Sequence, residues 1–367
     1  MSPPRPALAA ARRVVVKVGT NVVSRDGAVA LGRLGHLVES LAALVQGGRQ
    51  VVLVSSGAVG LGMERLGYAK KPRGRVDQQA CAAVGQGLLM GLYDGFFQRL
   101  GLSAAQMLLT EDDFHHRARS VNLAATLERL LARGAVPVIN ENDVVSPDPL
   151  AIFGDNDRLA ALVAAHVDAD ALVLLSDVEG LYTAPPGTEG ASLISTFTGQ
   201  SVAIGGLSTG GRGGMGAKVE AARVAAKAGV PTIIASGSVP DTLRDILQGL
   251  AVGTLFPADT TLSRRRRWIA FATAPQGTLH VNQGARDALV ERQASLLAPG
   301  IVSIDGPFDE GAVVTIVHDG VEVGRGVCAR SSAALREQLG KTERGKPVVH
   351  RDDIVIEVAT TPSQESP

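Results

Sequence analysis

Val14-Val15-Val16-Lys17-Val18 is an apolar, β-branched run that ends at Gly19, and Val51-Val52-Leu53-Val54 is a second run of the same kind that ends at Ser55. The residues between them, 31–46, have helical character. A strand, a helix and a second strand in this order form a βαβ unit. The opening of the chain therefore predicts an α/β fold.

The same alternation continues along the chain. We expect helices near residues 77–100, 120–132, 159–167 and 217–228, and strands near residues 103–109, 136–139, 171–175 and 230–235. Because strands and helices alternate throughout, the sequence predicts a mostly parallel sheet with helices on both faces.

The composition changes after a run of four arginines, residues 264–267. Beyond it come short β-like runs at residues 279–281, 300–304, 312–317, 321–327 and 348–349, and Asp319-Gly320 is a strong hairpin signal. We therefore expect a disordered tail over 1–10, an α/β domain over 11–260, a linker over 261–275, a small mainly-β domain over 276–356 and a second disordered tail over 357–367.

Composition weighs against several classes of protein. The 367 residues hold 36 Lys plus Arg and 36 Asp plus Glu, so overall charge gives no case for a nucleic-acid or membrane partner. Cys81 and Cys328 lie far apart without metal-ligand spacing, which favours a reducing cytoplasm. The longest apolar runs are interrupted by charged residues, so we expect no membrane span.

Two clusters of acids and amides indicate a ligand site. Asn140-Glu141-Asn142-Asp143 follows a strand, at the end where open α/β sheets bind ligands, and Gly154-Asp155-Asn156-Asp157 opens a helix. Helix capping explains one such residue, since a single Asp or Asn satisfies the exposed backbone donors. Two clusters across a short loop favour a binding site over capping alone.

Three glycine-rich turns indicate phosphate binding. Lys17 precedes Gly19-Thr20-Asn21, Ser55-Ser56-Gly57 ends the second strand, and the run at residues 210–217 precedes Lys218 at a helix start. Lys17 alone could equally be a strand-end lysine that reaches solvent. Two lysines, three such turns and several carboxylates together predict a phosphoryl-transfer enzyme that works by positioning and charge neutralisation, that is, a kinase.

Several segments resemble the glutamate 5-kinase family of amino-acid kinases, in matching order over nearly the whole chain. The amino-terminal segments are Val16-Lys17-Val18-Gly19-Thr20, Ser55-Ser56-Gly57-Ala58, Ala83-Val84-Gly85-Gln86 and Gln106-Met107-Leu108-Leu109-Thr110. The later ones are the two acid and amide clusters, Ser176-Asp177-Val178-Glu179-Gly180-Leu181-Tyr182 and Gly213-Gly214-Met215-Gly216-Ala217-Lys218. The carboxyl-terminal segment is similar to a PUA domain. The resemblance identifies 11–260 as an amino-acid kinase domain and 276–356 as a PUA-like domain.

The resemblance implies ATP-dependent phosphorylation of the L-glutamate side-chain carboxylate, the first step of proline biosynthesis. Its implied catalytic residues are Lys17, Lys218 and Asp157, and its implied glutamate-binding residues are Ser56, Asn140, Asp143, Asp155 and Asn156. The implied nucleotide-binding residues are Lys17, Gly19, Thr20, Ser176, Asp177, Arg212, Gly213, Gly214, Met215, Gly216, Ala217 and Lys218.

Mg²⁺ would be held mainly by the ATP phosphates, so no protein metal ligand is assigned. The carboxylate nucleophile is already ionised at neutral pH and requires no general base.

The resemblance also implies feedback inhibition by proline, a regulatory and oligomer-forming loop within residues 110–122, and a homo-oligomer, either dimer or tetramer. Arg212 departs from the related pattern, which has Thr beside the glycines. Two alternatives stay open: an amino-acid kinase acting on another carboxylate, and an RNA-binding regulator acting through the PUA-like domain. An inactive regulator with this fold is disfavoured because Lys17, Lys218 and Asp157 are all present. Neutral charge and few aromatic residues weigh against RNA binding.

Overall fold

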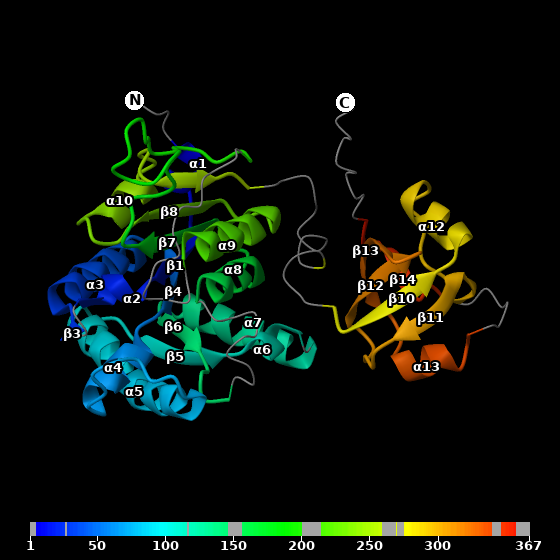
Figure 1. The fold of residues 1–367 in the computed structure, drawn as a ribbon, viewed down its shortest axis with the longest axis horizontal. Coiled ribbons are helices and arrows are strands. Elements are labelled where there is room, and N and C mark those ends of the chain that lie inside the picture. The colour runs from blue at the N-terminus through cyan, green and yellow to red at the C-terminus, as the bar shows by residue number, and fades with distance from the viewer. Residues whose placement is uncertain are drawn as a thin grey trace. The chain divides into compact units, whose positions relative to one another are not determined.

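The computed structural model describes residues 5–25, 28–115, 117–145, 156–199, 214–258, 269, 275–339 and 346–356. The chain divides into two compact units, Met1–Glu111 with Asn122–Asp259 and Asp112–Val121 with Thr260–Pro367 (Figure 1). None of the helices in these described ranges is long and apolar enough to cross a membrane.

The first unit is built on a seven-stranded sheet with the strand order β5-β6-β4-β1-β7-β8-β9. Neighbouring strands are parallel, except that β9 is antiparallel to β8. The strands are β1 (Arg13–Val18), β4 (Gln50–Ser55), β5 (Ala104–Leu109), β6 (Val136–Glu141), β7 (Ala171–Ser176), β8 (Thr232–Ser236) and β9 (Thr254–Phe256). Because β1 lies between β4 and β7, the chain reverses its direction of travel across the sheet there, where α/β sheets bind ligands.

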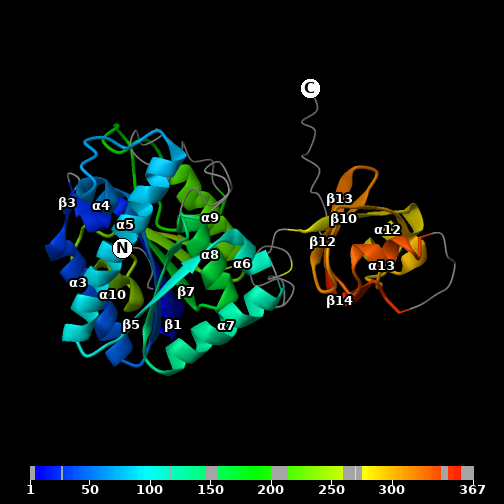
Figure 2. The same ribbon diagram turned by 90° about the horizontal axis from the view of Figure 1, so that it is seen from below.

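Helices cover both faces of this sheet. On one face lie α3 (Leu31–Gln46), α4 (Ala58–Arg65), α5 (Arg75–Arg99) and α10 (Thr242–Leu247), and on the other lie α7 (Arg117–Ala132), α8 (Asn156–His166) and α9 (Met215–Lys227) (Figures 1 and 2). The shorter elements of this unit are α1 (Pro6–Ala9), α2 (Thr20–Val23) and the small hairpin of β2 (Ser24–Arg25) and β3 (Ala28–Val29). The helix α6 (Glu111–His115) and the first residues of α7 fall at the boundary, since Asp112–Val121 is assigned to the second unit. The prediction of a mostly parallel sheet between helices is confirmed.

Alternation along the central strands decides which helix each side chain meets. In β1, Val14, Val16 and Val18 belong to a core cluster that includes side chains of α3 and α5. Successive residues of a strand point to opposite faces, so Val15 and Lys17 face the side covered by α8. Both faces of these strands are buried, as expected for a parallel sheet.

The second unit contains a mixed five-stranded sheet with the order β11-β10-β12-β13-β14. Its elements are β10 (Gly277–Val281), α12 (Gln283–Val290), the 3₁₀ helix η2 (Ala298–Gly300), β11 (Ile301–Asp305), β12 (Val313–His318), β13 (Val321–Cys328), α13 (Ser332–Arg336) and β14 (Val349–Ile356). The predicted hairpin is present: Asp319 and Gly320, both with positive φ (48° and 77°), join the antiparallel strands β12 and β13. The mainly-β character expected of this region is confirmed.

One prediction of irregular structure needs correction. Residues 5–10 were expected in a disordered tail, but α1 forms there, with Leu8 buried and the Arg5 guanidinium donating to the carbonyl oxygens of Ser195, Val252 and Gly253. Ile269, in the predicted linker, is fully buried in a small cluster of the second unit. The helix α6 was not expected from the sequence.

Candidate active site

Polar side chains gather where the central strands of the first unit end. Because β1, β4, β6 and β7 are parallel, their carboxyl ends meet at one edge of the sheet. Lys17, Ser56, Asn140 and Ser176 lie at these ends, and each is at most 9% exposed. Buried polar groups require hydrogen-bond partners, so these side chains must contact one another or a bound ligand.

One carboxylate holds two lysines at this edge. The Nζ atom of Lys17 lies 2.6 Å from Oδ1 of Asp157, and the Nζ atom of Lys218 lies 3.0 Å from Oδ2. The Asp157 side chain is fully buried and that of Lys17 is 3% exposed. Burying charges is costly unless they are paired, so the pairing fixes both ammonium groups. Two fixed ammonium groups side by side suit a transferring phosphoryl group.

The local structure explains how these three residues meet. Lys17 faces α8 through the alternation of β1, and Asp157 lies in the first turn of α8, where the helix dipole stabilises a negative charge. Lys218 lies in the first turn of α9, where the same dipole disfavours a positive charge. A lysine at this position does not stabilise the helix, so the contact with Asp157 explains why Lys218 lies in the first turn of α9.

Four further side chains form a continuous hydrogen-bonded relay. Asn140 has the same strand parity as Val136 and Val138 and faces α5, where its Nδ2 donates to Oε1 of Gln86 at 2.8 Å. Its Oδ1 accepts from Nδ2 of Asn156 at 2.9 Å, and this same Nδ2 lies 3.1 Å from Oγ of Ser56. Ser56, Asn140, Asn156 and Gln86 thereby connect the ends of β4 and β6 to the helices α5 and α8.

A second polar group lies at the end of β7. Asp177 accepts hydrogen bonds from Nδ2 of Asn21 at 2.7 Å and from Oγ of Ser176 at 3.0 Å. Burial of Asp177 acts to raise its pKa, but the hydrogen bonds from Asn21 and Ser176 and the charge of Lys218 outweigh it and leave the pKa below its ordinary value. Asp177 is therefore ionised at neutral pH and ties the turn after β1 to the end of β7.

Two glycines let the turns approach one another. Gly57 has φ of 109° at the start of α4, in the left-handed region, and a Cβ there would lie 3.0 Å from the Val23 side chain. A Cβ on Gly237, which follows β8, would lie 2.9 Å from both methyl carbons of Val22. Side chains at either position would push α2 away from the strand ends.

Comparison with known proteins identifies the family. Residues 12–236 match the Amino acid kinase family and residues 277–344 match the PUA domain. Three proteins named "Glutamate 5-kinase" align over 96% of this chain: that of Moorella thermoacetica at 44% identity (98% of its length), that of Myxococcus xanthus at 46% (98%) and that of Salinispora arenicola at 44% (100%).

The chain belongs to the glutamate 5-kinase family of amino acid kinases. Two solved structures are also similar. The first, isopentenyl phosphate kinase, has a TM-score of 0.48 and 17% identity and covers 66% of this chain and 99% of its own. UMP kinase from Bacillus anthracis has a TM-score of 0.47 and 18% identity and covers 69% of this chain and 98% of its own.

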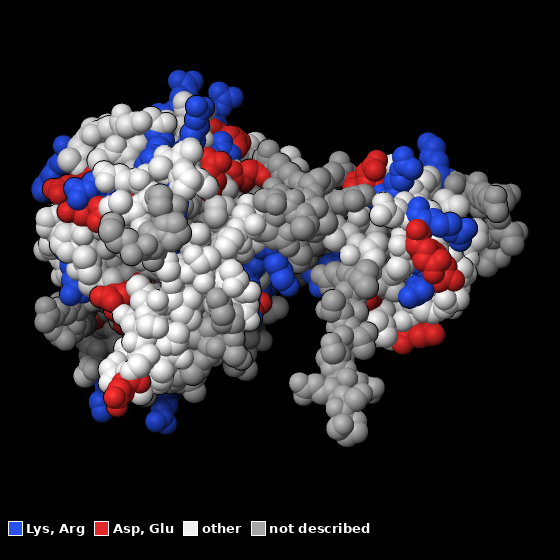
Figure 3. Space-filling model, turned by 90° about the horizontal axis from the view of Figure 1, so that it is seen from above, with Lys and Arg blue, Asp and Glu red and all other residues white. Residues whose placement is uncertain are grey.

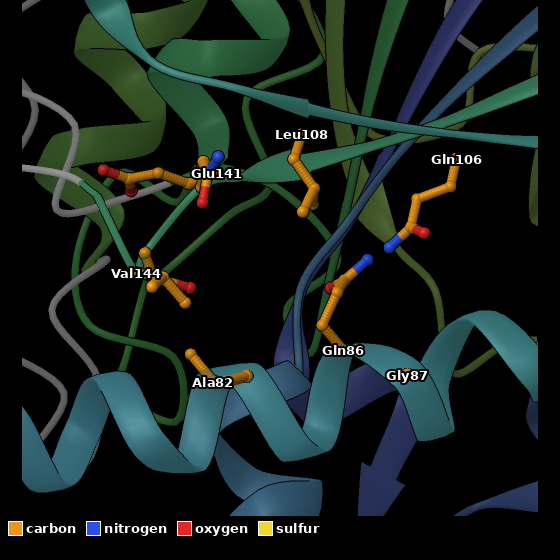
Figure 4. A pocket seen from close by; sticks show the side chains of 10 residues that line it. Ala82, Gln86, Gly87, Gln106, Leu108, Glu141 and Val144 are labelled. Atoms are coloured by element: carbon orange, nitrogen blue, oxygen red, sulfur yellow. The ribbon is translucent and has the colours of Figure 1, made fainter.

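A pocket of about 210 Å³ opens beside the relay (Figure 4). It is lined by Ala82, Ala83, Gln86, Gly87, Gln106, Leu108, Glu141, Asn142, Asp143 and Val144. Its walls are thus a face of α5, the ends of β5 and β6 and the first acid and amide cluster. Asp143 is half-buried there, and its carbonyl oxygen accepts from Nε2 of Gln79 at 3.2 Å.

The structure brings together most of the residues that the glutamate 5-kinase resemblance singled out. Lys17, Asp157 and Lys218 are in contact, as are Ser56, Asn140 and Asn156, while Asp143 lines the neighbouring pocket. Ser176 ends β7 and Asp177 follows it. Gly19 and Gly214 are the N-cap residues of α2 and α9, and Thr20 and Met215, Gly216 and Ala217 form the first residues of these helices. Asp155, Arg212 and Gly213 lie outside the described residues, as do 264–267.

Two residues of the site were not assigned a role from sequence. Gln86 belongs to a segment that carried the family resemblance, but its partner Asn140 is distant in the chain. Asn21 follows Thr20 in the first turn, and its partner Asp177 is equally distant. In the sequence, each is only a polar residue near a glycine, and that pattern does not reveal which distant side chain the residue contacts.

Proposed function

We propose that this protein transfers the γ-phosphoryl group of ATP to the side-chain carboxylate of L-glutamate, giving L-glutamyl 5-phosphate and ADP, the first step of proline biosynthesis. The observation that carries the proposal is the pair of ammonium groups held by Asp157, in a chain that is 44–46% identical to proteins named glutamate 5-kinase. Membership of a kinase family implies the use of ATP.

The chemistry requires positioning rather than proton transfer. A glutamate carboxylate oxygen attacks the γ-phosphorus while the bond from that phosphorus to the ADP oxygen breaks, and the electron pair leaves on ADP. The nucleophile is already ionised, so no base is needed. Lys17 and Lys218 offset the negative charge on the transferring phosphoryl oxygens, and Asp157 positions both lysines. Mg²⁺ arrives on the ATP phosphates, and we assign it no protein ligand.

Each substrate has its own part of the site in this proposal. Ser56, Asn140, Asp143 and Asn156 bind glutamate, together with Asp155, which lies outside the described residues. The acidic residues suit the α-ammonium group, while the reacting carboxylate points toward the lysines. Gly19, Thr20, Ser176, Asp177 and the segment from Arg212 to Lys218 bind the nucleotide. The strand-end turns and the start of α9 at one edge of the sheet support this division.

Regulation and assembly follow from the family resemblance. We propose inhibition by proline, a homo-oligomer (dimer or tetramer) and a cytoplasmic location. The regulatory loop is placed within residues 110–122. In its described part, α6 leads into α7, and Arg119 lies 3.6 Å from Asp113. Proline sensitivity that survives shortening of this segment would contradict its role.

The alternative of RNA binding would depend on the second unit. On the face seen in Figure 3, the described Lys and Arg side chains of this unit are interspersed with Asp and Glu. RNA binding relies on a continuous basic surface that neutralises phosphates. This face therefore supplies no argument for RNA as a partner.

An assay that traps acyl phosphates tests the proposed function. With ATP, Mg²⁺ and hydroxylamine, the protein should form a hydroxamate from L-glutamate and not from L-aspartate or N-acetyl-L-glutamate. Added proline should suppress the product. Hydroxamate from another acid only would keep the kinase chemistry and overturn the substrate assignment.

A further inference from the structure

Gln86 occupies an unusual place on α5. It is a polar side chain that is only 9% exposed, it follows Gly85, and α5 touches α4 at this point, since a Cβ on Gly85 would lie 1.7 Å from the carbonyl oxygen of Ala58. Figure 4 shows Gln86 reaching from α5 into the pocket, toward Gln106. The proposed chemistry does not use Gln86 directly.

The direction of each hydrogen bond in the relay follows from one backbone group. An amide side chain can be turned to exchange its oxygen and nitrogen, but a backbone N–H can only donate. The N–H of Glu141 lies 2.9 Å from Oδ1 of Asn140 and 3.3 Å from Oδ1 of Asn156. These atoms are therefore oxygens, and Nδ2 of Asn140 faces Gln86, whose Oε1 accepts.

The orientation of the two asparagine amides also decides whether Ser56 donates or accepts. Since Oδ1 of Asn140 is an acceptor, Nδ2 of Asn156 donates to it and also lies 3.1 Å from Oγ of Ser56. Oγ of Ser56 thus accepts from Asn156. A hydroxyl has one proton, and the relay does not use it, so the proton of Ser56 points out of the relay.

We propose that Gln86 is a positioning residue: it anchors the Asn140 amide in the orientation that the Glu141 N–H fixes, and so keeps Ser56 as a hydrogen-bond donor to a carboxylate of the acceptor substrate. Gln86 accepts from Asn140, Asn140 accepts from Asn156, and Asn156 donates to Ser56, which leaves the Ser56 proton for the substrate. This inference rests on the proposed function, in which Ser56 contacts glutamate. A donor suits a carboxylate, whereas a Ser56 oxygen lone pair would repel it.

The kinetic test uses a double-variant cycle. Gln86→Met keeps the length of the side chain and removes the acceptor, so the KM for glutamate should rise roughly tenfold while the KM for ATP changes little. In a Ser56→Ala background, the same substitution should add less than about twofold, because the hydroxyl that it misdirects is gone. An unchanged glutamate KM in Gln86→Met, or multiplicative effects in the double variant, would overturn the proposal.

The matched control is Gln78→Met on the same helix. Gln78 donates to the carbonyl oxygen of Pro72 and lies outside the relay, so this variant should keep the glutamate KM of the unsubstituted protein. A general effect of removing a glutamine from α5 would raise the KM in both variants. Equal increases in the two variants would therefore contradict a specific role for Gln86.

A second measurement is independent of turnover. In protein labelled with ¹⁵N-asparagine, hydrogen exchange of the Asn156 side-chain amide should be slow in the unsubstituted protein and in Gln86→Glu, which keeps an acceptor oxygen. It should be faster by about tenfold or more in Gln86→Met. Fast exchange in Gln86→Glu as well, or slow exchange in Gln86→Met, would overturn the relay.

The two measurements also separate this inference from the proposed function. If the unsubstituted protein forms no hydroxamate from glutamate, the proposed function fails before any variant is made. Exchange then decides whether Gln86 positions Asn156: loss of protection in Gln86→Met upholds it, and unchanged exchange overturns it. If glutamate is turned over, the double-variant cycle decides whether that positioning reaches Ser56 and the substrate.

Discussion

Lys17 and Asp157 form an ion pair of 2.6 Å between two side chains that are at most 3% exposed. Lys17 lies in the central strand β1 and Asp157 in the first turn of α8, so the pair links the two layers where the strand order reverses. A buried ion pair adds little net stability, because desolvation offsets the attraction. Its position and its second lysine therefore favour a functional explanation over a structural one.

The first prediction concerns the two lysines. Lys17→Met or Lys218→Met removes one positive charge from the phosphoryl site, and kcat should fall by about 100-fold or more, as when other transition-state donors are removed. Both variants should remain folded, because Asp157 keeps the other lysine. Lys227→Met, at the exposed last turn of α9, is the control for a lost lysine. A kcat close to that of the control would remove the substituted lysine from the mechanism.

Asp157→Asn should instead damage folding and catalysis together. The substitution leaves two buried ammonium groups side by side without their carboxylate, and breaking a buried pair in this way costs about 3 kcal/mol or more. Urea unfolding followed by circular dichroism measures the loss, and steady-state kinetics measures kcat. A variant as stable as the unsubstituted protein would show that Asp157 does not hold the lysines.

Local sequence patterns predicted the individual strands, helices and turns that carry the site residues. The β-branched run that contains Lys17 and stops at Gly19 predicted a strand and its turn, and Asp157 at the start of an apolar run predicted α8. The contact between them could not be read from either segment. Gln86 and its partner Asn140 illustrate the limit, because only the close packing of α5 on α4 brings that glutamine to the strand end.

The amino terminus shows how composition can mislead. A proline-rich opening favours disorder, yet Leu8 is buried and Arg5 donates to three carbonyl oxygens far along the chain, those of Ser195, Val252 and Gly253. Burial lowers the pKa of the Arg5 guanidinium. Contacts of this kind are tertiary, and a short helix depends on them more than on its own propensity.

Asp143 should affect substrate binding more than turnover. It lines the pocket beside the relay, so Asp143→Asn should raise the KM for glutamate roughly tenfold through loss of a charge-assisted contact and leave kcat nearly unchanged. Asp94→Asn, on the exposed side of α5, should change neither parameter. The hydroxamate assay at varied glutamate concentration measures KM and kcat for both variants, and an unchanged KM in Asp143→Asn would refute the assigned role.

Tyr93 provides a prediction about pH. Burial raises its pKa from 10.0 to about 12, partly opposed by its hydrogen bond with Ser55, at 2.8 Å. Because the pKa of Tyr93 is higher in the folded than in the unfolded protein, the folded state holds this proton more tightly. The stabilisation is fully present below pH 10, and the free energy of unfolding then falls by about 1.4 kcal/mol per pH unit as the pH rises toward 12. Tyr93→Phe lacks this loss, so the unfolding free energies of the two proteins should approach each other above pH 10. Urea unfolding at several pH values measures both, and parallel pH profiles would contradict the assigned pKa.

The last prediction concerns two glycines of α5. A Cβ on Gly85 would lie 1.7 Å from the carbonyl oxygen of Ala58 and 2.6 Å from the backbone nitrogen of Gly62, so Gly85→Ala must push α5 away from α4. This should cost about 1–3 kcal/mol and raise the KM for glutamate, because Gln86 moves with the helix. Gly91 has no atom within 4 Å of the added Cβ, and Gly91→Ala should stabilise the protein by about 0.5–1 kcal/mol through helix propensity. Urea unfolding of both variants should therefore give shifts of opposite sign, and shifts of the same sign would show that α4 and α5 are not packed through Gly85.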